Sequence, residues 1–307
     1  MGAGYDTIDP CSITPLPLMY LYLRILALLI LTCTQVGASS RVKVFVSTLP
    51  QQYFFEQIGA DKIKVSVMVG PGQSPTTFDP TPRQMAELAS ADLYQSIGVP
   101  FERIWMPDIA RRIPGLKIVD ARKGMTLRNI EGKHDHDNHQ PQIDRTKDPH
   151  IWTDPLLVKN IADQILQNLI ELAPEHSVFF TQNHHSFVQR MDILDKKIRL
   201  ILSGVKNRSF MVFHPSWGYF ADRYDLHQIP VEQEGKSPGA KILANLIQAA
   251  RNAGIKTILV QKQFSQHSAK ILANSLDGNV VAVDPLAYNY PENMEHIAKV
   301  IADTAIK

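Results

Sequence analysis

Long apolar runs are scarce in this 307-residue sequence, and the run near its start, Ile25–Leu31, falls well short of a membrane-spanning helix, which needs roughly 18 apolar residues. A retained membrane anchor is therefore the weaker interpretation. Arg24 precedes this run, and Val36-Gly37-Ala38, a small-residue site of the kind that signal peptidases cut, follows it. We therefore expect residues 1–38 to be a cleaved signal peptide.

Cysteine is nearly absent, with only Cys11 and Cys33 in the whole chain. Both precede the expected cut after Ala38, so the mature protein would have no disulfide and must derive its stability from its core. Lipid attachment at Cys33 is the lesser alternative, because Thr32 stands where lipoprotein leaders usually have Gly, Ala or Ser. The first 18 residues, with two aspartates and three prolines, fit a leader poorly, which makes Met19 the better start.

No charge of one sign dominates, because 32 Lys and Arg stand against 30 Asp and Glu, a formal net charge of +2. This balance, together with the lack of a basic stripe, predicts no nucleic-acid partner. The sequence also lacks the HExxH helix, the GxSxG turn and the glycine-rich phosphate loop. These absences count against the commonest hydrolases and nucleotide-binding enzymes.

After residue 39, short β-branched runs alternate with amphipathic stretches, the pattern of parallel sheets covered by helices. The pattern predicts an α/β fold in two similar halves. In the first half we expect strands at 42–47, 64–69, 93–97 and 117–119, with helices at 51–58, 82–89 and 101–111. In the second half we expect strands at 209–213, 227–231, 257–260 and 280–283, with helices at 217–223, 239–252, 266–276 and 293–305.

Between the halves, apolar residues recur at helical spacing after Pro174. They are Phe180, Phe187, Met191, Leu194, Ile198 and Ile201. The spacing predicts one helix over 175–203, about 40 Å long and thus able to lie along two lobes, although an ordinary surface helix has the same pattern. We expect an N-terminal lobe at 39–174, this linking helix, and a C-terminal lobe at 204–307.

A polar segment interrupts the first half at residues 131–148 and has no apolar periodicity. It contains His134, Asp135, His136, Asp137 and His139. We expect an inserted loop. Its imidazoles and carboxylates could capture a metal transiently, and the alternative is a plain solvated segment.

Three further residues combine metal-binding chemistry with a favourable place in the chain. His214 follows the expected strand 209–213, and Asp284 follows the strand 280–283. Both therefore belong to the carboxyl edge of a parallel sheet, where open α/β folds bind ligands. His150 precedes a helix that Asp154 could cap. Each alone is weak evidence, because single histidines and Asp-Pro turns are common.

Taken with their surroundings, these residues resemble the solute-binding receptors of zinc and manganese ABC importers across essentially the whole mature chain. The motifs that carry the resemblance are Thr48-Leu49-Pro50, Pro71-Gly72-Gln73-Ser74-Pro75, Phe78-Asp79-Pro80-Thr81-Pro82, Asp148-Pro149-His150-Ile151-Trp152, Phe213-His214-Pro215-Ser216-Trp217, Glu234-Gly235-Lys236-Ser237-Pro238 and Asp284-Pro285-Leu286.

The resemblance implies two α/β lobes joined by one long rigid helix, with a metal held between the lobes by His150, His214 and Asp284. It implies an exported, periplasmic or extracytoplasmic receptor, which we expect to be a monomer. Its partners would be the membrane permease and the ATPase of an ABC importer. One position departs from the pattern, because Thr76 stands where relatives usually have a first histidine. Water, a bidentate Asp284 or a histidine of the 134–139 loop could complete the metal coordination.

The nitrogen-rich ligand set favours Zn(II) as the bound cargo over Mn(II), Fe(II) or another divalent cation. Two other classes of protein remain as alternatives. A zinc-dependent hydrolase could use an open His₂Asp site, and a metal-binding surface adhesin could share the same scaffold. No general base stands beside the expected ligands, so we expect a binding protein and not an enzyme.

Overall fold

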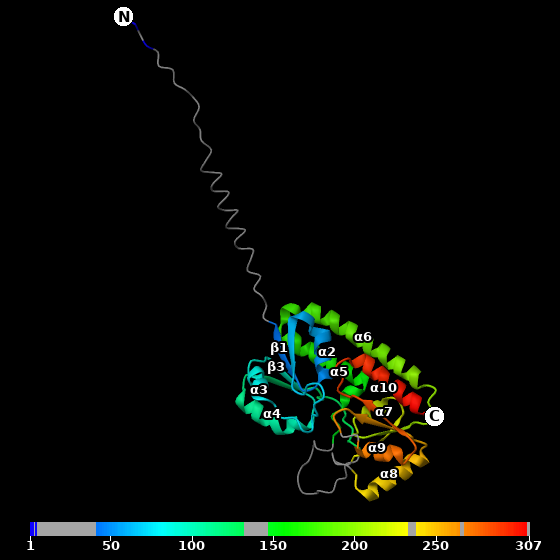
Figure 1. Ribbon diagram of the computed structural model, residues 1–307. Helices are drawn as coiled ribbons and strands as arrows, with labels where there is room; N and C mark the ends of the chain where they lie inside the picture. Colours follow the sequence, from blue (N-terminus) through cyan, green and yellow to red (C-terminus); the bar gives the residue numbers. More distant parts are fainter. Residues whose placement is uncertain (3, 5–40, 132–146, 233–237, 265–266, 306–307) are drawn as a thin grey trace. The chain divides into compact units, whose positions relative to one another are not determined.

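Two parallel sheets and one long helix organise the described part of the chain (Figure 1). The computed structural model describes residues 1–2, 4, 41–131, 147–232, 238–264 and 267–305. Nearly all of the expected signal peptide, both cysteines, the histidines at 134–139 and residues 234–237 lie outside the described residues. The predictions made for them stay predictions.

The first sheet has the strand order β2-β1-β3-β4, with all strands parallel. β1 is an inner strand of this sheet, and its residue Val44 pairs with both Val65 of β2 and Leu93 of β3. The strands are β1 (Val42–Val46), β2 (Ile63–Val67), β3 (Leu93–Ser96) and β4 (Lys117–Asp120). The helices that connect them are α2 (Leu49–Gly59), α3 (Pro82–Leu88) and α4 (Pro100–Arg112).

The second sheet repeats the scheme with the order β6-β5-β7-β8, again all parallel. Met211 of β5 pairs with Ile229 and Ile258 on either side. The strands are β5 (Ser209–Val212), β6 (His227–Pro230), β7 (Thr257–Gln261) and β8 (Asn279–Val283). The helices are α7 (Gly218–Arg223), α8 (Ala240–Asn252), α9 (His267–Asn274) and α10 (Tyr290–Ala305). Every strand coincides with its predicted range to within two residues.

The linking helix is α6 (Ser177–Leu202), which follows a 3-10 turn at Pro174–His176. It packs on α2 and on α5 (Pro155–Leu172) at one end and on α10 at the other (Figure 1). Its predicted apolar stripe is buried, with Leu202 in place of the half-buried Ile201. The expected α/β architecture with one long helix is confirmed.

The hydrophobic core is continuous from the first sheet across α6 to α10. The fully buried Phe54 of α2 and Tyr290 of α10 meet edge to face, with ring centroids 4.9 Å apart, and Phe187 of α6 lies against Phe54 at 5.8 Å. Residues 41–307 accordingly form one compact unit. No helix among the described residues is both long enough and apolar enough to cross a bilayer.

Candidate metal centre

His150 is held by the buried carboxylate two residues before it. Asp148 Oδ1 accepts a hydrogen bond from the His150 backbone N–H at 3.0 Å and lies 2.7 Å from the imidazole Nδ1. Thr153 Oγ1 donates to His150 O at 2.9 Å, within the 3-10 turn that leads to α5. With Nδ1 engaged by the carboxylate, Nε2 is the ring nitrogen left to bind a ligand.

His214 is held in the same way at the carboxyl edge of the second sheet. Its Nδ1 makes a short hydrogen bond with Glu232 Oε1, and Glu232 follows the neighbouring strand β6. Gln261, at the end of β7, donates Nε2 to His214 O at 2.7 Å and accepts the His214 N–H at 3.2 Å. The ring of Phe264 stacks on the His214 imidazole, with ring centroids 4.9 Å apart.

Glu232 is a functional candidate that the sequence analysis missed. It is 4% exposed, and its second carboxylate oxygen, Oε2, has no hydrogen-bond partner among the described residues. No motif marks it. The available signal was weak, since it is an acidic residue just after strand 227–230, at the same sheet edge as His214.

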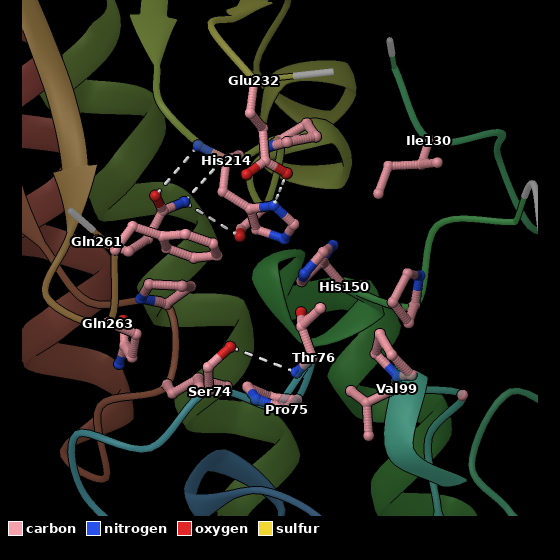
Figure 2. Close-up of a pocket in the computed structure, with 18 of the residues that line it drawn as sticks. Ser74, Pro75, Thr76, Val99, Ile130, His150, His214, Glu232, Gln261 and Gln263 are labelled. Atoms are coloured by element: carbon pink, nitrogen blue, oxygen red, sulfur yellow. Dashed lines mark hydrogen bonds and ion pairs between the residues drawn. The ribbon is translucent and has the colours of Figure 1, made fainter. Parts of the chain in front are cut away.

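The two histidines line one cavity of about 210 Å³, and their ring centroids lie 5.4 Å apart. Figure 2 shows Thr76 and His150 on one side of this cavity and His214 and Glu232 on the other. The Thr76 backbone N–H donates to Ser74 Oγ at 3.3 Å. The structure thus brings together residues from three segments that are far apart in sequence.

Asp284 follows β8 as predicted, but its carboxylate does not line the cavity. Asp284 Oδ1 accepts hydrogen bonds from Gln263 Nε2 at 3.1 Å and from the Leu286 N–H at 2.9 Å. Its neighbours Pro285 and Leu286 do line the wall. In the described part of the chain, no three His, Cys, Asp or Glu side chains are grouped closely enough to hold one metal ion.

Arg128 links Asp148, the carboxylate that holds His150, to Asp222 in the second half of the chain. Its guanidinium forms ion pairs with Asp148 at 3.2 Å, Glu131 at 2.7 Å and Asp222 of α7 at 2.9 Å. Gly218, at the start of α7, lies against it. A Cβ atom on Gly218 would overlap the Arg128 guanidinium and would stand 2.9 Å from Asp148 Oδ2.

Burial keeps His150 in the neutral form that binds metals. Desolvation by burial lowers the pKa of His150 below its ordinary value, although Asp148 opposes that shift. Burial by itself would raise the pKa of Asp148, but His150 and Arg128 outweigh it and hold that pKa below its ordinary value. The pair therefore consists of a neutral imidazole that donates Nδ1–H to an ionised carboxylate, and the lone pair of Nε2 is available.

Paired parallel sheets that share one long helix, with two imidazoles that face one cavity, define the class of two-lobed α/β solute-binding proteins. The sequence model of one family, described as zinc-uptake complex component A, periplasmic (ZnuA), matches residues 44–304. The chain belongs to this family, which consists of binding proteins and not of enzymes. The hydrolase alternative is thereby removed.

Individual relatives agree with this membership. Two crystal structures of ZnuA, one of them of a deletion mutant with zinc bound, share 35% identity with the chain at a TM-score of 0.80 and cover 86% of it. The chain covers 98% and 99% of those structures. The high-affinity zinc uptake system protein ZnuA of Bacillus subtilis is 25% identical over 80% of the chain and 79% of its own length.

The zinc-binding protein AdcA of Streptococcus pyogenes is 26% identical over 82% of the chain, but over only 52% of its own length. The chain thus spans about half the length of the streptococcal relatives that it matches.

Proposed function

We propose that this protein is an extracytoplasmic receptor that binds Zn(II) through His150, His214 and Asp284 and delivers it to the permease and ATPase of an ABC importer. One observation carries the proposal. Two imidazoles face one cavity, and each has its Nδ1 on a buried carboxylate, Asp148 or Glu232. Metal-binding histidines have this arrangement, because the carboxylate fixes the tautomer and orients Nε2 toward the ion.

Zinc suits the proposed donors best. Imidazole is a borderline ligand that zinc prefers more strongly than Mn(II) does, and zinc accepts three protein ligands with a fourth, open position. Asp284 is the proposed third ligand. Its carboxylate would have to turn away from Gln263 to reach the cavity, and Gln263 itself lines the wall. Relatives of the chain are named as zinc-binding or zinc-uptake proteins, and one ZnuA structure has zinc bound. Both findings support the choice of zinc.

The experiment that tests the proposal is zinc titration calorimetry on the His214→Ala variant. We expect zinc affinity to fall roughly 100-fold or more, because the ion loses one of two nitrogen donors. His185→Ala is the matched control, since His185 lies on α6 beside Gln189 and away from the cavity. Unchanged affinity in His214→Ala, or an equal loss in both variants, would contradict the proposal.

A further inference from the structure

The cavity is much larger than one metal ion. Its volume of about 210 Å³ is far above the roughly 10–15 Å³ that a single water molecule requires. Zinc in proteins prefers four donors, and the proposed set of His150, His214 and Asp284 supplies three. At the remaining side stands Thr76, whose neutral hydroxyl is a poor zinc donor (Figure 2). The site therefore has both an open coordination position and room beyond it.

The cavity wall contains basic side chains of the kind that bind an anion. Two positively charged residues, Arg103 of α4 and Lys147, line the cavity. Lys147 Nζ donates to two neutral oxygens, Asn129 Oδ1 at 3.0 Å and Leu127 O at 3.4 Å. Arg103 forms no ion pair within the described ranges.

The same wall also carries two carboxylates, and neither is paired with Arg103 or Lys147. Glu131 is paired with Arg128 at 2.7 Å, and Glu232 is bonded to His214. Neither Arg103 nor Lys147 therefore has an ion-pair partner among the described residues, and each of these two charges attracts an anion and repels a cation near it.

We infer that this cavity takes zinc together with a small chelating carboxylate, an amino acid or hydroxy acid, so that the cargo is a metal chelate. The inference rests on the proposed zinc function and specifies its substrate. An amine or hydroxyl donor of the chelator takes the open position beside Thr76. The carboxylate lies at Arg103 and Lys147, where guanidinium and ammonium groups bind such anions by charge-assisted hydrogen bonds.

The test uses the full chain loaded with one equivalent of zinc and titrated separately with L-histidine, citrate and imidazole. Native mass spectrometry should detect a 1:1:1 complex of protein, zinc and chelator with L-histidine or citrate, and the two arms distinguish amino acids from hydroxy acids. Imidazole is a donor without a carboxylate, so we expect it to bind at least tenfold more weakly. Equal binding of imidazole would overturn the role assigned to Arg103 and Lys147.

Arg103→Gln supplies the second measurement, with Arg111→Gln on the same helix as the matched control, because Arg111 is paired with Asp108 outside the cavity. Arg103→Gln should weaken chelator binding at least tenfold and should raise the affinity for zinc alone, because a repelling charge is removed. A merely structural role for Arg103 would lower both affinities, and that result would overturn the inference.

Failure of the inference and failure of the proposed function are distinguishable. Tight binding of zinc alone, with no ternary complex in any arm, would overturn only the chelate inference. An absence of zinc binding with and without chelator would overturn both. Thr76→His gives an independent check, because an imidazole at that position should close the coordination sphere and abolish the ternary complex.

Discussion

At the scale of single residues, Thr76 is the position that most limits the proposed zinc affinity. It lines the cavity with a neutral hydroxyl where an imidazole would be a far better donor. We expect Thr76→His to raise the affinity for chelator-free zinc tenfold or more, equivalent to about 1.4 kcal/mol. Competition with a chromogenic zinc chelator measures this change.

The neighbouring Thr77 is the control for this substitution. Thr77 is exposed and does not line the cavity, so Thr77→His should leave the affinity of the tight site unchanged. If Thr76→His binds zinc no better than the unmodified protein, another donor already fills the fourth position. Deletion of residues 133–139 in the same background then tests whether that donor is a histidine of the polar segment.

At the scale of elements, the proposed metal centre depends on how closely α7 approaches the segment that carries His150. Gly218 begins α7, and only hydrogen at its Cα leaves room for Arg128 and Asp148. We expect Gly218→Ala to displace Arg128, weaken the hold of Asp148 on His150 and lower zinc affinity by roughly tenfold, as losses of such supporting contacts usually do. Calorimetry measures the affinity, and thermal unfolding measures the accompanying loss of stability.

Gly204→Ala is the matched control, because a Cβ at Gly204 meets nothing within 4 Å. Gly204→Ala should change neither the zinc affinity nor the thermal stability. An unaltered zinc affinity in Gly218→Ala would show that Arg128 contributes nothing to the orientation of His150.

The start of α4 contains a buried acid that shapes the neighbouring cavity wall. Glu102 accepts hydrogen bonds from the backbone N–H groups of Ile97 at 2.9 Å and Gly98 at 2.6 Å, and it bonds to Ser47 Oγ. Gly98 lines the cavity. Burial raises the pKa of Glu102 from 4.5 to about 7. This carboxyl group is therefore protonated at a higher pH in the folded protein than in the unfolded chain.

The contribution of Glu102 to the stability of the folded protein depends on pH. Between pH 4.5 and about 7 the folded state holds a proton that the unfolded chain has released, so this group adds stability as pH falls through that window and adds no more below it. Relative to Glu102→Gln, the free energy of unfolding should rise by roughly 1.4 kcal/mol per unit of decreasing pH. Urea unfolding at pH 5, 6, 7 and 8 tests this difference.

Glu87→Gln, on the exposed side of α3, is the control and should show no such slope. If the free energies of unfolding of the unmodified protein and of Glu102→Gln differed by the same amount at every pH from 5 to 8, that result would contradict the raised pKa.

At the scale of the whole molecule, one core cluster reaches both sheets, and a second, smaller cluster packs on the second sheet alone. The larger cluster runs from the first sheet through α6 to α10, and Phe54 meets Tyr290 within it. We expect differential scanning calorimetry of the unmodified protein to show one cooperative unfolding transition. Tyr290→Ala should lower the free energy of unfolding by about 3 kcal/mol or more and still give a single transition. Two separable transitions in the unmodified protein would show that the halves unfold independently.

The sequence by itself determined the elements and their order. Local signals suffice for this, as at Thr81-Pro82, where Gln84 completes a capping box at the start of α3, and at Asp154-Pro155, which begins α5. Hydrophobic periodicity likewise predicted the strands and α6, because apolar spacing depends only on neighbouring residues. These local signals fix the ends of an element less closely than its presence. The helix α10, for example, begins at Tyr290, three residues before its predicted start.

Motif order, too, was sufficient to nominate His150, His214 and Asp284. It could not indicate what each side chain contacts. Glu232 lies 18 residues from His214 in sequence, and Asp222 lies far from Arg128. Such pairs meet only because sheet order and helix packing place their elements together, and apolar periodicity does not encode that arrangement.

The tertiary structure alone decided that both imidazoles keep Nε2 for a ligand and that Asp284 bonds to Gln263. Side-chain orientation is set by the nearest partners in space. For His214 and Asp284 those partners follow strands that are neighbours in the sheet, although long connections separate them in the chain. The partner of His150 is instead Asp148, two residues before it.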